Sequence, residues 1–203
     1  PLHRTTKRLV IRPLVASDFA AWRNAHGALP PPQNRWDRGR RGPEELSRPR
    51  FREVLEHQRK LRREDRFYSL AVFERTSGAL VGGASLMDVM RGLAQAAFLG
   101  WFVHSPFWRR GYGKEAVRAL IDIGFRDVGL HRLEAGIEPE NRRSILLARS
   151  LGLSVATISD ALRDSPRVQA DTRARVKRAA ERAGYRPNPL LGATLSALRR
   201  SRH

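Results

Sequence analysis

Residues 102–120 read FVHSPFWRRGYGKEAVRAL, a stretch that decides the fold because it runs from a strand through a tight loop into a helix. The helix is expected to begin near Gly113, so unpaired backbone N–H groups and the positive end of the helix dipole meet at the loop. Such a terminus suits a phosphate group, and Gly111 and Gly113 would let the backbone approach it closely. The same spacing also fits a turn that needs glycine for steric reasons alone. Three basic side chains add positive charge to this loop: Arg109, Arg110 and Lys114.

The segments around this loop alternate between strand and helix patterns. Residues 67–74 and 79–89 are short and rich in strand-forming residues, and the TSG turn between them predicts a hairpin. Ser17 and Asp18 precede an apolar stretch and predict a capped helix, whereas the proline, glycine and arginine residues of 30–45 predict a surface loop. The other expected elements are strands over 8–14, 96–103 and 132–138, and helices over 19–26, 51–63, 115–128 and from near Asn141. This order predicts an α+β fold with a mixed sheet.

The chain of 203 residues is strongly basic, with a formal net charge of +19. About +12 of this charge lies in residues 1–153 and about +7 in the much shorter remainder. Such a charge attracts polyanions, whether DNA, RNA or a phosphate-rich cofactor. Nearly all the basic residues are arginine, however, and a GC-rich genome would produce the same bias without any selection for binding.

The composition also excludes several classes of site. The chain contains no cysteine, so disulfides, thiolate metal sites and cysteine nucleophiles are ruled out. No apolar run approaches the roughly 18 to 20 residues of a membrane span, and the N-terminal residues lack the apolar centre of a signal peptide. We therefore expect a cytoplasmic protein that has no membrane partner and no metal.

Three segments of the chain carry a family resemblance. They are TKRLVIRPLVASDFAAW over 6–22, LGWFVHSPFWRRGYGKEAVRALIDIGF over 99–125 and LHRLEAGIEPENRRSILLARSLGL over 130–153. In this order they resemble the GNAT superfamily of N-acetyltransferases, particularly its ribosomal-protein-alanine N-acetyltransferase branch, over about residues 5–153. The resemblance implies a mixed β-sheet with flanking helices and transfer of an acetyl group from acetyl-CoA to a primary amine. The acceptor would be a protein N-terminus or a small amine.

The resemblance also implies where acetyl-CoA would bind. In this family a W-x-x-G-x-G/A loop grips the pyrophosphate through main-chain amides, and the preceding strand, here around residues 100–103, pairs with the pantetheine. Trp108 stands where many other members carry Gln or Arg. Asn141 and Ser144 would lie near the thioester and the pantetheine arm, although both are also ordinary residues for a helix N-terminus. The implied cofactor contacts are Phe102, Val103, Trp108, Arg109, Arg110, Gly111, Tyr112, Gly113, Lys114, Asn141 and Ser144.

The implied reaction is attack of the amine on the acetyl thioester. The amine must lose a proton to a base, and the tetrahedral oxyanion needs a hydrogen-bond donor such as a backbone N–H. Glu134 and Glu138 would lie on one face of the expected strand and could act as base directly or through water. Both also fit carboxylates on a solvated strand, and no feature pairs His104 or His131 with a carboxylate. The catalytic residue therefore stays open at this stage.

Beyond Gly152 the chain resembles a different family. Residues 147–198 read LARSLGLSVATISDALRDSPRVQADTRARVKRAAERAGYRPNPLLGATLSAL, which is similar to the DNA-binding headpiece of LacI-family repressors. The pattern agrees with a helix-turn-helix unit, since Gly152 would form the turn and Ser154 would cap a second helix over 155–162. A generic helical hairpin is the alternative.

The LacI resemblance implies contacts to double-stranded DNA. In this family the second helix enters the major groove, so Val155, Ala156 and Asp160 would meet base edges. Residues 188–198 would form the hinge helix, and Thr194 stands where its wedging leucine usually lies. The implied DNA contacts are Ser154, Val155, Ala156, Thr157, Ser159, Asp160, Arg167, Thr172, Tyr185 and Asn188.

The two resemblances together predict a two-part chain. Residues 1–152 would form an acetyltransferase domain without its last two strands, and 153–203 an all-α helix-turn-helix domain whose first helix overlaps 144–152. One helix cannot bury a single apolar face in two cores, so we expect a compromise over 145–151. The leading interpretation is an N-acetyltransferase fused to a DNA-binding segment. The alternatives are a LacI-type transcriptional regulator with an inactive or sensory acetyltransferase part, and a poorly folded chimera with neither activity.

Overall fold

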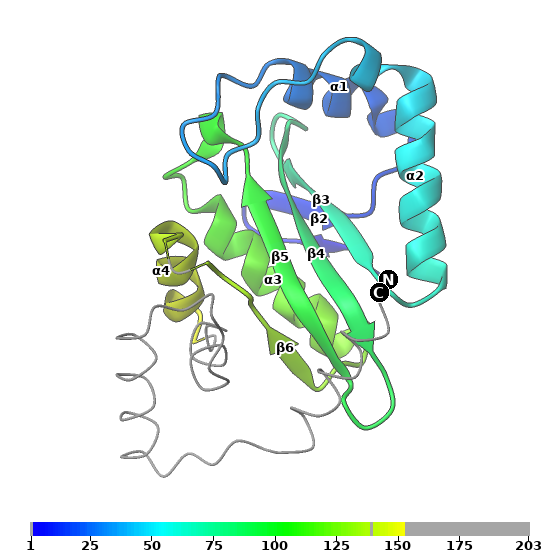
Figure 1. The fold of residues 1–203 in the computed structure, drawn as a ribbon, viewed down its shortest axis with the longest axis vertical. Helices are drawn as coiled ribbons and strands as arrows, with labels where there is room; N and C mark the ends of the chain where they lie inside the picture. Colours follow the sequence, from blue (N-terminus) through cyan, green and yellow to red (C-terminus); the bar gives the residue numbers. More distant parts are fainter. Residues whose placement is uncertain (1, 139, 153–203) are drawn as a thin grey trace.

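The computed structural model describes residues 2–138 and 140–152 and contains one six-stranded sheet (Figure 1). The strands follow chain order; the first five run antiparallel, and the sixth joins the fifth in parallel. The expectation of an α+β fold with a mixed sheet is thus confirmed. The strands are β1 (Arg4–Thr5), β2 (Leu9–Arg12), β3 (Tyr68–Glu74), β4 (Leu80–Met90), β5 (Ala96–Val103) and β6 (Arg132–Glu134). The helices are α1 (Phe19–Gly27), α2 (Arg48–Arg63), α3 (Tyr112–Arg126) and α4 (Arg142–Ser150), with short 3₁₀ turns η1 (Ala16–Asp18), η2 (Glu44–Leu46) and η3 (Ser105–Phe107).

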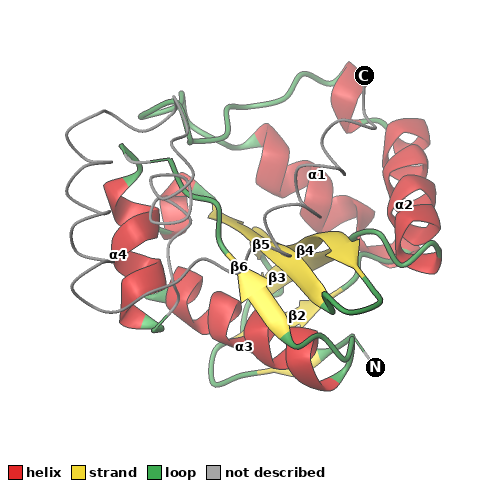
Figure 2. Cartoon of the chain, turned by 60° about the horizontal axis from the view of Figure 1, so that its bottom comes forward, coloured by secondary structure: helices red, strands yellow, loops and turns green. Residues whose placement is uncertain are grey.

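Helices cover both faces of the sheet (Figure 2). α3 packs on one face, where Leu120 and Ile123 are fully buried against the sheet. α1 and α2 pack on the other face through a cluster that includes Phe19 and Phe51. The alternation of β3 serves both layers, because Leu70 and Val72 face α3 while Ala71 and Phe73 face α1 and α2. Burial of each large apolar side chain contributes about 1.5 to 3 kcal/mol, so these two clusters are a major source of the fold's stability.

The expected hairpin turn and the expected surface loop are both confirmed. The hairpin turn lies between β3 and β4, and Gly78 adopts the left-handed φ of 69° that this turn requires. The surface loop over 30–45 ends at η2, after which Ser47 caps α2 by accepting a hydrogen bond from the Arg50 N–H at 3.4 Å. None of the helices within the described ranges is long and apolar enough to cross a membrane.

The expected side-chain cap of α1 is not formed. The Asp18 carboxylate instead accepts two hydrogen bonds from Arg12, at 2.7 and 2.8 Å, and one from the Val15 N–H at 2.8 Å. A charged, two-pronged contact with a guanidinium is stronger than a single bond to a helix N–H, so the carboxylate turns toward Arg12. Asp18 therefore ties β2 to the start of α1.

α4 is the helix that both family resemblances include. In the described structure it packs on the start of α3, where the Leu147 side chain lies against Gly113 and Ala148 is fully buried. Leu146 keeps 64% of its surface exposed. The acetyltransferase side therefore uses only part of the apolar surface of α4. The second domain over 153–203, its DNA contacts and the expected absence of the last two strands lie outside the described residues.

Candidate functional site

β5 and β6 separate and leave one side of β5 open. Their pairing is confined to Ala96–Phe98 against β6, whereas β5 continues to Val103. The N–H of the next residue, His104, donates to the Val81 carbonyl on the β4 side at 2.9 Å. Polar groups of successive strand residues point to opposite sides in turn, so those of Trp101 and Val103 face the open side. The end of β5 thus offers main-chain groups to a ligand that lies along it.

The loop after β5 presents a row of free backbone donors. Arg109 and Gly111 adopt left-handed φ angles of 62° and 78°, and α3 begins at Tyr112. Within the described part of the chain, the amide N–H groups of residues 109–114 have no acceptor, and the Glu115 N–H is the first to reach a carbonyl, that of Gly111 at 3.3 Å. Left-handed residues in such turns shape concave sets of N–H groups, and the helix dipole adds positive potential. This loop can therefore bind an anionic group such as a phosphate.

Arg8, near the N-terminus, holds this loop in place. Its guanidinium donates to the Arg110 carbonyl at 2.7 Å and pairs with Glu115 at 2.7 Å. Glu115 also accepts from the Thr6 hydroxyl at 2.6 Å. Burial alone would raise the pKa of Glu115, but the hydrogen bonds from Thr6 and Arg8 outweigh it and lower the pKa. No local sequence signal identifies Arg8 or Thr6, because both contacts span more than 100 residues.

The two glycines of the loop serve different purposes. At Gly111 the left-handed backbone disfavours any side chain. At Gly113 an added β-carbon would lie 2.8 Å from the Leu147 Cδ1 atom of α4. The steric explanation therefore accounts for Gly113, because its missing side chain lets α4 pack closely against the start of α3.

The end of β5, the loop and α4 are joined through Trp108. Its indole N–H donates to the Val103 carbonyl at 2.6 Å, and the Arg143 guanidinium lies 4.8 Å from its ring centroid. This bond occupies one of the main-chain groups on the open side of β5. The Asn141 side chain caps α4 by accepting from the Ser144 N–H at 3.2 Å, which fits the helix-terminus reading of both residues.

The remaining expected cofactor residues divide between the loop surface and the core. Arg109, Arg110 and Lys114 are exposed beside the free amides. Tyr112 is buried and its hydroxyl donates to Glu74, so only its main-chain N–H is available at the loop. The Phe102 ring packs on Gly83 and lies 3.7 Å from the Arg38 guanidinium, on the side of α1.

The two candidate carboxylates do not share a strand face, which corrects the sequence expectation. β6 ends at Glu134, whose carboxylate pairs with Arg132 at 2.7 Å. Glu138 lies beyond the strand, is exposed, and pairs with Arg35 of the 30–45 loop. β6 is shorter than expected because it pairs with β5 at only three positions before the two strands diverge. Glu134 lies at the point of divergence, and Glu138 lies farther along the connection to α4.

His104 is buried at the end of β5, and neither of its ring nitrogens has a hydrogen-bond partner among the described residues. Burial is the main cause that lowers the pKa of His104 to about 4, and the neighbouring His26 and Arg38 contribute to this shift. The His26 ring meets it edge-on at 5.2 Å. His104 is therefore neutral near pH 7 and shielded from solvent. His131, the residue before β6, is exposed. Residues 2–138 and 140–152 hold no group of three potential metal-binding side chains.

Known proteins resemble this chain in two regions. The profile of the bacterial regulatory proteins of the LacI family matches residues 147–188. The chain is 57% identical over 42 residues to the HTH-type transcriptional regulator AglR of Rhizobium meliloti, a match that covers 21% of this chain and 12% of that protein. This part of the chain is therefore similar to LacI-family proteins.

The profile of the Acetyltransferase (GNAT) domain matches residues 8–154, which is most of the chain. The chain is 33% identical over 99 residues to the probable N-acetyltransferase YjcK of Bacillus subtilis, covering 49% of this chain and 54% of that protein. It is 31% identical over 86 residues to the [ribosomal protein uS5]-alanine N-acetyltransferase of Escherichia coli, covering 42% and 44%. These matches thus span about half the length of the curated relatives.

A solved structure shares the fold. The ribosomal-protein-S5-alanine acetyltransferase of Vibrio fischeri superposes with a TM-score of 0.59 at 20% identity, covering 75% of this chain and 82% of that protein. The strand–loop–helix unit around 102–120 lies inside the matched profile, and the fold around it agrees. This chain belongs to the GNAT family of acetyltransferases.

Proposed function

We propose that this chain is an acetyl-CoA-dependent N-acetyltransferase that modifies a primary amine. The observation that carries the proposal is the row of free amides over 109–114, which follows directly on the open side of β5. An anion-binding helix terminus and an unpaired strand edge meet there, as a long cofactor with a pyrophosphate and an amide-containing arm requires. The GNAT family uses acetyl-CoA as its acetyl donor, which agrees with this arrangement.

The residues fit acetyl-CoA in two stretches. The amides of residues 109–114 would bind the pyrophosphate, with Arg109, Arg110 and Lys114 adding positive charge around it. The main-chain groups of Trp101 and the N–H of Val103 would pair with the pantetheine. The Val103 carbonyl is not included, because it already accepts a hydrogen bond from the Trp108 indole. When bound, acetyl-CoA supplies an activated acetyl thioester.

The acceptor amine must lose a proton near the end of β5. Glu138 and Glu134 are two of the carboxylates on the β6 side of the opening, and each is paired with an arginine, Arg35 and Arg132 respectively. A carboxylate near the amine could accept its proton directly or through water. We propose Glu138 as the first candidate base, because it is exposed and lies beyond the point where β6 leaves β5.

The acceptor we propose is the amino terminus of a protein. The support is the relative from Escherichia coli, whose name gives an alanine of ribosomal protein uS5 as its acceptor. Residues 147–188 support a second activity, binding to double-stranded DNA, because they match the LacI profile and are basic. Duplex binding that weakens steeply as salt rises would support this second activity, and its absence would remove it.

The cofactor site can be tested by reversing charge beside the free amides. In the Arg110→Glu, Lys114→Glu double variant, carboxylates would repel the pyrophosphate, and we expect the affinity for acetyl-CoA to fall about 100-fold. Isothermal titration of acetyl-CoA into the full chain measures this. Gly111 and Gly113 are poor test positions, because substitution at either disturbs the loop or the packing of α4.

The matched control is Arg52→Glu, Arg59→Glu, which makes the same charge change at two exposed arginines of α2. It should bind acetyl-CoA within about twofold of the wild type, since exposed charges at a distance are largely screened. Equal losses of acetyl-CoA affinity in the two variants would show a general charge effect and would count against the proposed cofactor site. A wild-type protein that is folded but binds no acetyl-CoA would remove the proposed function.

A further inference from the structure

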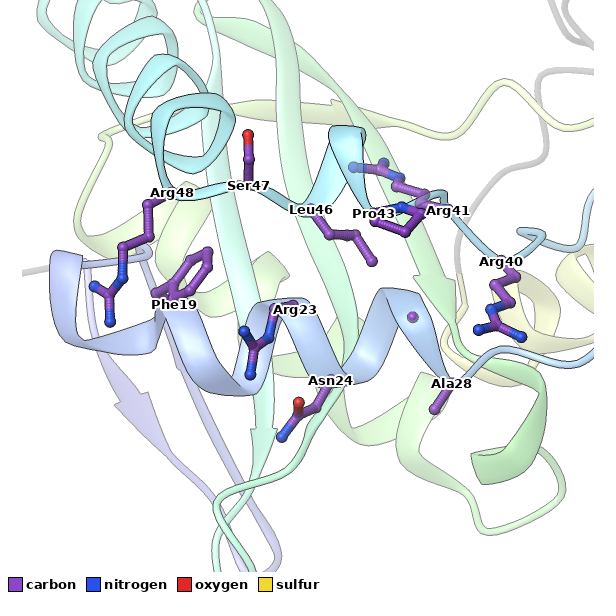
Figure 3. A pocket seen from close by; sticks show the side chains of 11 residues that line it. Phe19, Arg23, Asn24, Ala28, Arg40, Arg41, Pro43, Leu46, Ser47 and Arg48 are labelled. Carbon is purple, nitrogen blue, oxygen red and sulfur yellow. The ribbon is translucent and has the colours of Figure 1, made fainter.

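A groove lies between α1 and residues 40–48, outside the cofactor site (Figure 3). Its volume is about 680 Å³, which is in the usual range for ligand pockets. Phe19 and Leu46 supply apolar surface, and no acidic side chain lines the groove. Its charge comes from four arginines: Arg23, Arg40, Arg41 and Arg48. We call this feature the arginine groove.

The charges of the arginine groove are not compensated within the described part of the chain. None of its four arginines forms a salt bridge there, whereas Arg4, Arg8 and Arg12 each pair with a carboxylate. Arg23 and Arg48 lie 5.5 and 4.6 Å from the centroid of the same buried ring, that of Phe19. The guanidinium groups of Arg23 and Arg48 thus lie against an aromatic ring and keep their hydrogen-bond donors available. Planar guanidinium donors match carboxylate and phosphate groups, so the groove suits an anionic ligand.

One end of the arginine groove adjoins the end of β5. The Arg41 N–H donates to the His26 carbonyl at 3.1 Å, and the His26 ring contacts His104, the residue after β5. From there the groove follows α1 from Ala28 back to Phe19, a distance of roughly 14 Å at the helical rise per residue. About four residues of an extended peptide span that length.

We infer that the arginine groove binds an acidic segment that follows the amino terminus of the acceptor peptide. This inference rests on the proposed acetyltransferase function, because the acceptor amine is placed at the end of β5. An acceptor whose amine lies there would extend along α1, with its acidic side chains beside the four arginines. Acceptors with Asp or Glu among roughly the first five residues are therefore preferred.

The shape of the groove favours a peptide over nucleic acid. Duplex DNA is read by helices or strands that project into its grooves, whereas this site is concave and of ligand size. Single strands bind in positively charged grooves that also offer open aromatic faces for base stacking. Phe19 offers no such face, since it is buried and two guanidinium groups lie against its ring. An extended acidic peptide needs neither feature.

The test compares two peptides on the full chain. Both begin with a free alanine amino terminus; in one it is followed by four alternating Asp and Glu residues, in the other by Asn and Gln. Binding is measured by fluorescence anisotropy with a label at the peptide's carboxyl end, and acetylation by mass spectrometry with saturating acetyl-CoA. We expect the acidic peptide to bind at least tenfold more tightly, and the difference to shrink as salt rises.

Two variants locate the effect. Arg23→Glu, Arg40→Glu should weaken binding of the acidic peptide about 100-fold and leave the neutral peptide within about twofold. All four substituted side chains of the test and control pairs are exposed, so both variants should fold. The control, Arg52→Glu, Arg59→Glu, should retain the preference for the acidic peptide, because it carries the same charge change on α2 outside the groove.

Each outcome distinguishes the inference from the function on which it rests. Groove-dependent binding of the acidic peptide without acetylation would keep the groove assignment and remove the proposed function. Acetylation of both peptides with equal KM, unchanged in the groove variant, would keep the function and overturn the groove. Groove-dependent binding of a short oligonucleotide in place of the acidic peptide would also overturn it.

Discussion

Lowering the pH from 7 to 4 is expected to remove about 3 kcal/mol from the free energy of unfolding through His104 alone. The folded-state pKa of His104 is lowered to about 4, below the ordinary value of 6.5, chiefly because the ring is buried. The unfolded chain therefore takes up this proton more readily than the folded protein. The stabilisation from the neutral ring is complete above pH 6.5 and is lost as the pH falls toward 4.

The measurement is urea-induced unfolding followed by tryptophan fluorescence at several pH values between 7 and 4. All four tryptophans of the chain lie between residues 22 and 108, so the signal reports on the acetyltransferase part. In His104→Leu the loss over this pH range should be smaller by about 3 kcal/mol, because the ring that would take up the proton is gone while the carboxylates remain. Parallel stability curves for the two proteins would show that the His104 ring is not held neutral by burial.

Asp18→Ala is expected to destabilise the protein by about 3 kcal/mol, because it leaves the Val15 N–H without its acceptor and the Arg12 guanidinium without its charged partner. The Asp18 side chain is only 9% exposed, so solvent replaces the lost bonds poorly. Burial alone would raise the pKa of Asp18, but the bonds from Arg12 and Val15 outweigh it, and the pKa is lowered. Urea unfolding at pH 7 measures the change in stability.

Two further variants distinguish the loss of the Asp18–Arg12 ion pair from a nonspecific loss of stability. Asp18→Asn keeps an acceptor oxygen in place and should lose less stability than the alanine variant. Glu56→Ala removes an exposed carboxylate from α2 and should stay within about 0.5 kcal/mol of the wild type. If Asp18→Ala lost no more stability than Glu56→Ala, the pair with Arg12 would not anchor the start of α1.

Much of the local structure could be predicted from the sequence. The hairpin at Gly78, the strand before Trp108 and a helix that begins near Gly113 follow from turn residues and apolar spacing, which act over a few residues. The loop over 109–114 was recognisable for the same reason, since its glycines and basic residues are adjacent in the chain. The family resemblance rested on these same local motifs and is confirmed by the profile match.

The features that local patterns could not reveal depend on contacts between distant residues. Arg8 supports the loop across about 100 residues of sequence, and the space at Gly113 is needed for Leu147 of α4. The length of β6 depends on where β5 and β6 diverge, which a strand pattern does not report. The local pattern predicts that Asp18 caps α1, whereas its carboxylate binds Arg12 of β2. The arginine groove likewise combines α1 with a segment that reads as an ordinary surface loop.

Amide hydrogen exchange, read residue by residue by NMR with and without saturating CoA, tests the central claim that the loop after β5 binds this cofactor. The account predicts slower exchange at the amides of residues 109–114, with further protection at Trp101 and Val103 on the open side of β5. Exchange at exposed amides of α2 should not change. Binding of CoA without protection of residues 109–114 would contradict the account and place the cofactor elsewhere on the chain.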